Sequence, residues 1–247
     1  YLQRRSIVTA NRTRACKGNE MSERGKYVVV EGADGVGKST VMNLLAQRAH
    51  RELGVNYITI EEPGGALDMD GNQLVPVSEK IRAVIKDGEL ARSALTNVLL
   101  FNASRRENLQ QAIEPALARG DWSFAARNYY STDVYQGKAE GWPIEDIERM
   151  VLEATSTSYM QPDYAFILDI PEEMRLERLA RRGGRTDLDT FEKRPTEFQI
   201  AVGNGYRWLA KEKGIPLIDA TAPAEEVADH VWHRIMYGVA PSDKSLF

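Results

Sequence analysis

The chain has 247 residues, of which 43% are hydrophobic and 28% charged, so a sizeable core is expected and global disorder is not. The net charge of −4 argues against a general nucleic-acid-binding surface, and no apolar run approaches the ~18 residues of a membrane helix. The single cysteine, Cys16, excludes an intramolecular disulfide and a zinc site built from cysteines. We expect one soluble, cytoplasmic α/β domain without nucleic-acid or membrane partners.

Residues 1–26 are basic and show neither helical nor strand periodicity. Glu20 and Glu23 are the acidic residues in this stretch, which is otherwise rich in Arg and Lys. An organelle transit peptide is one interpretation, and untranslated or tag-like sequence ahead of a start at Met21 is another. We favour the second interpretation and expect this leader to be disordered in either case.

The first periodic element is an apolar, β-branched run at residues 27–30, which predicts a strand. It leads through a glycine-rich stretch with the spacing G-x-x-x-x-G-K-[ST] into a helical pattern. Glycines let the backbone N–H groups of such a loop point at phosphate oxygens, and the helix start adds further donors. In this pattern Lys38 would reach the β- and γ-phosphates, and Ser39 would place its hydroxyl on Mg²⁺. The candidate phosphate-binding residues are Gly32, Ala33, Asp34, Gly35, Val36, Gly37, Lys38, Ser39 and Thr40.

Strand and helix patterns alternate along the rest of the chain, which predicts a parallel five-stranded sheet with helices on both faces, the P-loop NTPase architecture. The expected strands are 27–30, 56–60, 121–125, 164–170 and 215–219. The expected helices are 38–53, 77–86, 91–119, 144–158, 172–182, 190–213 and 224–236. The domain would span 27–237, followed by a tail at 238–247. Ligands of such sheets bind beyond the carboxyl ends of the strands, so the loops there are the candidate sites.

The turn after the second strand and the helices that follow it carry further candidate binding residues. The second strand leads into the turn Pro63-Gly64-Gly65, and Arg82 follows on the next helix. Phe101 and Arg105 are four residues apart on a predicted helix and share one face, so they could stack on a base and donate to its carbonyl. On its own, Phe101 is also compatible with a core position.

The loop predicted after the third strand offers Arg127 as a phosphate clamp and Gln136 as a donor and acceptor for a pyrimidine edge. Further on, an arginine cluster borders the glycines at 183 and 184. We interpret this segment, about residues 181–190, as a lid whose arginines would reach a phosphoryl-transfer transition state. The candidate lid arginines are Arg181, Arg182 and Arg185.

Together these motifs resemble the thymidylate kinase family of P-loop nucleoside monophosphate kinases. The matching segments are Glu62-Pro63-Gly64-Gly65, Leu100-Phe101-Asn102-Ala103-Ser104-Arg105, Ser131-Thr132-Asp133-Val134-Tyr135-Gln136-Gly137 and Pro162-Asp163 with the strand to Asp169. The resemblance implies ATP-dependent, Mg²⁺-assisted phosphorylation of dTMP to dTDP by a homodimer. The acidic Asp34 in the P-loop is similar to the bacterial type, in which the lid supplies the catalytic arginine.

The resemblance also implies roles for individual residues. Lys38, Arg127 and the three lid arginines would be catalytic, and Ser39 would hold the metal. The substrate-binding set for dTMP would be Asp34 for the 3′-hydroxyl, Phe101, Arg105 and Gln136 for the base, Tyr135 for the sugar, Arg82 and Arg127 for the phosphate, with Pro63 and Ser131 lining the site.

Three positions depart from the family pattern. Ala126 and Asn128 flank Arg127 where the family has Asp-Arg-Tyr or Asp-Arg-His, and Glu61 stands where the family has Arg before Glu-Pro-Gly-Gly. Loss of a carboxylate that organises a metal commonly costs ~10–100-fold. The departures therefore leave two alternatives open, a related kinase with another acceptor and a nucleotide-binding protein without turnover.

Overall fold

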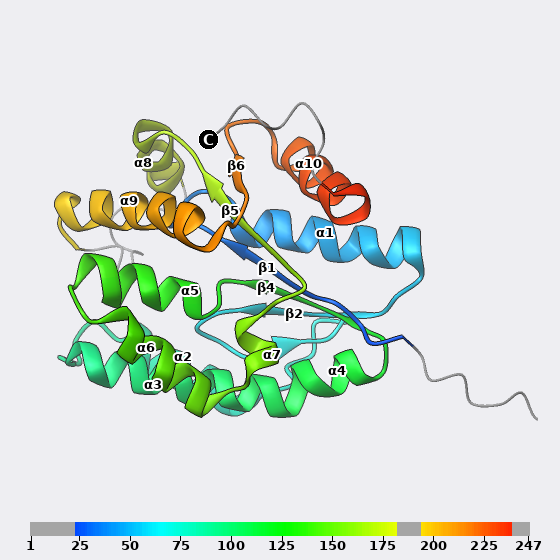
Figure 1. The fold of residues 1–247 in the computed structure, drawn as a ribbon, viewed down its shortest axis with the longest axis horizontal. Coiled ribbons are helices and arrows are strands. Elements are labelled where there is room, and N and C mark those ends of the chain that lie inside the picture. Colours follow the sequence, from blue (N-terminus) through cyan, green and yellow to red (C-terminus); the bar gives the residue numbers. More distant parts are fainter. Residues whose placement is uncertain (1–22, 182–193, 239–247) are drawn as a thin grey trace, which may run out of the picture.

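The computed structural model describes residues 23–181 and 194–238. Within these ranges six strands form one sheet in the order β3-β2-β4-β1-β5-β6 (Figure 1). Neighbouring strands are parallel except for the antiparallel pair β2–β3. The strands are β1 (Tyr27–Glu31), β2 (Tyr57–Glu61), β3 (Ala66–Leu67), β4 (Trp122–Ala126), β5 (Tyr164–Asp169) and β6 (Leu217–Asp219).

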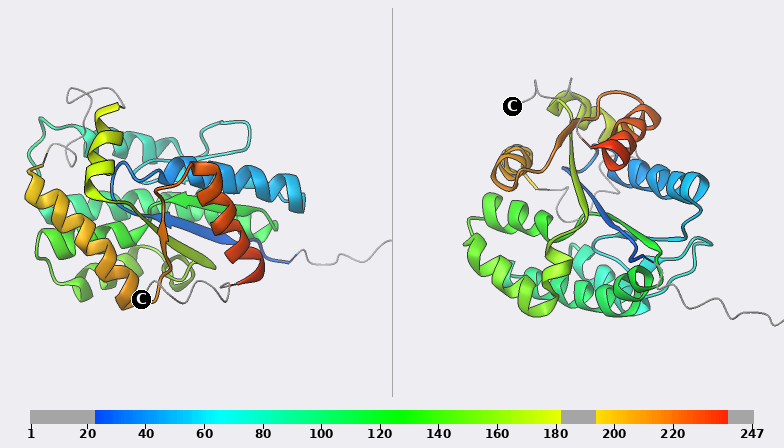
Figure 2. Two further views of the ribbon diagram at one scale, coloured as in Figure 1. Left: turned by 90° about the horizontal axis from the view of Figure 1, so that it is seen from above. Right: turned by 45° about the vertical axis from the view of Figure 1, so that its right-hand side comes forward.

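Helices cover both faces of the sheet. Figures 1 and 2 show α1 and α10 on one face, and the group from α2 to α7 on the other. The bounds are α1 (Lys38–Leu53), α2 (Pro76–Lys86), α3 (Ala94–Asn108), η1 (Leu109–Ile113), α4 (Glu114–Ala118), α5 (Tyr129–Thr132), η2 (Asp133–Ala139), α6 (Ile144–Ala154), α7 (Thr157–Met160), α8 (Glu172–Arg181), α9 (Thr196–Lys213) and α10 (Ala224–Tyr237).

The core lies between the sheet and these two helical layers. All five residues of β1 are buried, as expected for a central strand of a parallel sheet covered on both faces. Helix α1 buries Val41, Met42, Leu45 and Ala49 along one stripe, which matches helical periodicity. The α/β class, the parallel sheet and helices on both faces are thus confirmed.

The prediction of five strands was wrong by one. The additional strand β3 has two residues and pairs with β2. So short a strand has no alternating pattern to detect.

The predicted loop after β4 was also wrong beyond Asn128, because residues 129–139 are helical (α5 and η2). Aromatic and β-branched residues with a glycine at 137 have low helix propensity. Packing against α6 and α9 overrides this local preference and buries Tyr129, Tyr130 and Val134.

Several helices begin or end at residues other than those predicted, and the sequence around each boundary explains the difference. The helix predicted from residue 91 begins at Ala94, where the Ser93 side chain accepts the Thr96 N–H. The same helix widens into the π turn η1 just before Pro115, which has no N–H to donate. The helix predicted over 144–158 is interrupted at Thr155, and the one predicted from 190 begins after Pro195. Residues 1–22, 182–193 and 239–247, which include most of the predicted leader, lid and tail, lie outside the described residues.

Candidate nucleotide-binding site

The loop between β1 and α1 has a backbone that requires its glycines. Gly35 and Gly37 have φ angles of 89° and 102°, in the left-handed region. A Cβ on Gly32 would lie 2.4 Å from the Leu168 carbonyl oxygen. Lys38 begins α1, is buried, and donates from Nζ to the Ala33 carbonyl at 2.8 Å. A glycine-shaped loop, a helix start and a lysine beneath it form a donor set that fits nucleotide phosphates.

Helix α8 supports this loop from outside. Arg175 is buried; it donates to the Asp34 carbonyl at 3.2 Å and is held by Glu172 at 2.6 and 2.7 Å. Arg178 donates to the Val36 carbonyl at 3.3 Å. Sequence reasoning missed Arg175, because on a charged helix it resembles a solvent-exposed residue, and it placed Arg178 in the arginine cluster of the predicted lid instead of against the P-loop.

An ion pair joins the P-loop to the end of β4. The Asp34 carboxylate pairs with Arg127, lies 3.8 Å from Lys38 Nζ, and accepts the Tyr135 O–H at 2.9 Å. Burial alone would raise the pKa of Asp34, but Arg127 and then Lys38 outweigh it, so the pKa of this carboxyl lies below its ordinary value. The predicted residues Asp34, Lys38, Arg127 and Tyr135 therefore form one cluster.

Arg127 is held in place from several sides. It has a φ of 78°, the one positive value recorded for a non-glycine residue in the described ranges. Such backbone costs about 1–3 kcal/mol and persists only where surrounding contacts determine it. Here the N–H of Arg127 donates to the Val30 carbonyl at 3.0 Å, and its Nη1 donates to Ser131 and Tyr206 at 3.2 and 3.0 Å.

A buried glutamate lies behind this cluster. Glu31 accepts the Asn128 N–H at 2.7 Å, the Ser131 hydroxyl at 2.8 Å and the Tyr206 hydroxyl at 3.0 Å. Burial raises the pKa of Glu31, and the nearby Arg127 opposes that rise. Sequence reasoning missed Glu31 and Tyr206. Glu31 could have been found because it is a charged residue at the end of a buried strand. No feature of the sequence indicated a role for Tyr206 on α9.

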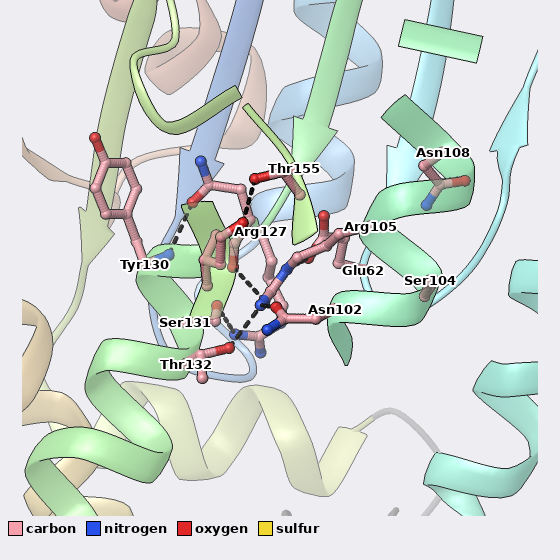
Figure 3. A network of polar contacts seen from close by, with 12 residues as sticks. Glu62, Asn102, Ser104, Arg105, Asn108, Arg127, Tyr130, Ser131, Thr132 and Thr155 are labelled. Atoms are coloured by element: carbon pink, nitrogen blue, oxygen red, sulfur yellow. Dashed lines mark hydrogen bonds and ion pairs between the residues drawn. The ribbon is translucent and has the colours of Figure 1, made fainter. Parts of the chain in front are cut away.

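A second polar network surrounds Arg105 (Figure 3). Arg105 is 1% exposed; it donates to Glu62 at 2.8 Å, Asn102 at 3.2 Å, the Asn128 carbonyl at 3.0 Å and Thr132 at 2.9 Å. Its guanidinium carbon lies 5.5 Å from the centre of the Phe101 ring. Phe101 is half-buried, so the predicted base-reading pair is adjacent and Phe101 is not a closed core residue.

The turn at residues 62–65 is fixed by side chains from α2 and α3. Arg82 contacts the Pro63 carbonyl, and Glu79 accepts the Gly65 N–H at 2.8 Å. From α3, Asn108 donates to the Gly64 carbonyl at 2.7 Å. Arg82 is therefore bound to this turn in the structure, and the turn connects the P-loop side of the sheet with the Arg105 network.

Several buried amide donors near these clusters have no partner among the described residues. They include Nε2 of Gln136, which lies in η2, and Nδ2 of Asn102, which lies in α3. A buried amide without a partner is costly, and a polar ligand would satisfy it. Both donors are therefore candidates for hydrogen bonds with a polar ligand.

The predicted lid is only partly described. Arg181 is exposed at the end of α8 and forms an ion pair with Glu177 at 3.5 Å, so it does not join either cluster. Arg182 and Arg185 lie outside the described residues. The described ranges contain no group of three or more His, Cys, Asp or Glu side chains that could hold a metal ion. No helix there is long and apolar enough to cross a membrane.

This fold and site define a P-loop nucleotide-binding protein of the α/β class. The thymidylate kinase family model matches residues 30–231. A thymidylate kinase of Rhodopseudomonas palustris is 37% identical over 218 residues, covering 87% of this chain and 90% of that protein. Thymidylate kinases of Psychrobacter sp. and Afipia carboxidovorans are 33% and 32% identical, over 85% and 88% of this chain and 97% and 91% of theirs. The chain therefore belongs to the thymidylate kinase family.

Proposed function

We propose that this protein phosphorylates dTMP to dTDP with ATP as the donor. The observation that carries the proposal is the Asp34–Arg127 ion pair, with Tyr135 bonded to the same carboxylate. It connects the P-loop directly with the loop expected to bind the acceptor. Its location at the carboxyl ends of β1 and β4 is where open parallel sheets bind ligands.

The mechanism is positioning and charge neutralisation for in-line transfer of the γ-phosphoryl group. Lys38 and the N–H groups of the P-loop hold the donor phosphates. Arg127 holds the acceptor phosphate, after exchanging part of its bonding with Asp34 for phosphate oxygens. Mg²⁺, when bound, neutralises charge on the transferring group, and Ser39 would hold it. Arg181, Arg182 and Arg185 are proposed to add positive charge from the lid.

Recognition of dTMP would use the second network. Phe101 stacks on thymine, while Arg105 and Gln136 hydrogen-bond its edge. Arg105 is held rigidly by Glu62, Asn128 and Thr132, which suits a base-reading group because its geometry is set before binding. Pro63, Arg82 and Ser131 complete the site around the phosphate and sugar, with Asp34 on the 3′-hydroxyl.

The test is ATP-dependent formation of the nucleoside diphosphate from dTMP with Mg²⁺, beside dUMP, dCMP, dGMP and thymidine. Strong preference for dTMP supports the proposal. Turnover of another acceptor would mean a related kinase, and dTMP binding without turnover would mean a protein kept for nucleotide binding. Binding must therefore be measured separately, by titration calorimetry with dTMP alone.

We further propose that the protein is cytoplasmic and forms a homodimer. The two copies would pack through α2, α3 and α6. These helices pack on one another and carry exposed apolar side chains. The side chains are Val77, Val84, Leu95, Leu99 and Leu152, each at least 40% exposed. Leu99→Glu is expected to shift the sedimentation coefficient from dimer to monomer. Leu176→Glu, an exposed leucine on α8, is the matched control, and an unchanged Leu99→Glu assembly would refute this interface.

A further inference from the structure

The last residue of β4 is Ala126, which lies on the sheet face covered by α1 and α10. The ring of Tyr57 on β2 packs 6.4 Å from His50 of α1, and Trp122 on β4 packs 6.3 Å from Trp232 of α10. Side chains alternate along a strand, so positions 57, 59 and 61, and positions 122, 124 and 126, share that face. Ala126 is 3% exposed and presents only a methyl group there.

Glu61 is the direct neighbour of Ala126 on that face. The parallel register pairs Glu61 with Ala126, and Ala126 in turn pairs with Val30 of β1, one residue before the strand ends at the P-loop. Neighbouring strands lie about 4.8 Å apart, and a glutamate side chain is one methylene longer than an aspartate. Glu61 can therefore bring a carboxylate over the position that Ala126 leaves without one.

The surroundings of Glu61 leave its carboxylate available. The residue is exposed, and its carboxylate has no hydrogen bond or ion pair with the residues that the structure describes. Its backbone, in contrast, is fixed by the β2–β4 pairing and by the Glu62 N–H, which donates to the Ala126 carbonyl at 3.0 Å. A carboxylate without a protein partner, on an anchored backbone at the sheet end where β1 leads into the P-loop, suits a metal ligand.

Mg²⁺ is usually held in phosphoryl-transfer sites by one or two carboxylates, together with phosphate oxygens and waters. In this chain, one departure removes a carboxylate from position 126, and the other places one at the register partner. We propose that Glu61 supplies the carboxylate for the nucleotide-bound Mg²⁺, directly or through its water shell, in place of a residue at 126. This inference rests on the proposed use of Mg²⁺ and ATP at the P-loop.

The test measures metal binding without turnover. Mn²⁺, as a spectroscopic substitute for Mg²⁺, is titrated into the protein–ADP complex and free Mn²⁺ is followed by electron paramagnetic resonance. Glu61→Gln keeps the size of the side chain and removes its charge. We expect it to weaken Mn²⁺ binding about 10–100-fold. Affinity for ADP in the presence of a chelator is expected to stay unchanged, because the P-loop contacts do not involve residue 61.

A rescue and a control make the result specific. Ala126→Asp in the Glu61→Gln background is expected to restore Mn²⁺ affinity, because it returns a carboxylate to the same sheet face. Glu114→Gln, an exposed glutamate on α4, is the matched control and should leave it unchanged. Unchanged Mn²⁺ affinity in Glu61→Gln would overturn the inference even if the protein phosphorylates dTMP. Weakened Mn²⁺ binding without dTMP turnover in the original chain would support the inference and refute the proposed function.

Discussion

Removing the Arg105 guanidinium is expected to destabilise the fold strongly, because it leaves a buried carboxylate without its cation. The side chains of Arg105 and Glu62 are 2% and 5% exposed, and Nε lies 2.8 Å from the carboxylate. Arg105→Met keeps most of the apolar length and deletes the charge. Breaking a buried pair from one side costs about 3–5 kcal/mol of unfolding free energy. The bonds to the Asn128 carbonyl and Thr132 are lost as well, which favours the upper half of that range.

A substitution of Glu62 tests whether Arg105 and Glu62 stabilise the fold as a pair. Glu62→Gln leaves a buried guanidinium uncompensated and keeps the hydrogen bond with Tyr159, which lies 2.5 Å from the carboxylate. If the two groups act as a pair, the double variant should lose less than the sum of the single losses. The expected coupling free energy is about 2 kcal/mol or more, within the range for residues in contact.

The assay is urea unfolding followed by far-UV circular dichroism, with comparison of midpoints at equal m-values. Arg106→Met is the matched control, since Arg106 is the next residue on α3 and is exposed with one long contact, 3.4 Å to the Ala154 carbonyl. It should change stability by less than about 1 kcal/mol. The reasoning is refuted if Arg105→Met costs no more than Arg106→Met, or if the two losses at Arg105 and Glu62 simply add.

Three further outcomes are expected. Lys38→Ala should fold normally, as judged by circular dichroism. Its phosphotransfer rate should fall about 100-fold or more, because the positive charge near the transferring group is lost. An unchanged rate would remove the P-loop from the mechanism. Gly32→Ala should abolish measurable ADP binding in calorimetry, because its Cβ would meet the Leu168 carbonyl oxygen at 2.4 Å, whereas Gly54→Ala, with nothing within 4 Å, should bind normally. Burial, and then Glu148, raise the pKa of Asp133 to about 8, so the folded state keeps a proton that the unfolded chain releases near pH 4. The free energy of unfolding should therefore fall as pH rises between these values, by about 1.4 kcal/mol per pH unit. Asp133→Asn should make the melting temperature less dependent on pH between pH 5 and 8.

Elements with a strong periodic pattern were predictable from the sequence. The predicted bounds of α1 match the structure, and β1, β2 and β4 differ by a residue at one or both ends. In each, the apolar pattern and the burial agree, so local preference and tertiary packing point to the same structure. The helix at residues 129–139 was missed because there the two disagree, and the disagreement falls beside the candidate site.

The candidate site was predictable where a motif or a position after a predicted strand suggests chemistry, as with Lys38 and Arg127. It was not predictable where a role depends on what surrounds the residue. Nothing local distinguishes Arg175, which supports the P-loop, from an exposed arginine on the same helix. Tyr206 lies far along the chain from Glu31 and Arg127, and only the packing of α9 brings them together.

The role of position 126 also depends on its surroundings, and here the surroundings change the conclusion about function. Considered along the chain, Ala126 and Glu61 are separate departures from the family pattern, and each argues for reduced activity. The strand order β2-β4-β1 makes them register partners on one sheet face, at the end where β1 leads into the P-loop. Strand order depends on contacts between distant segments, which no local pattern encodes. Once the register is known, the same two residues support the proposed metal-binding role of Glu61, and that role would offset the absence of an aspartate at position 126.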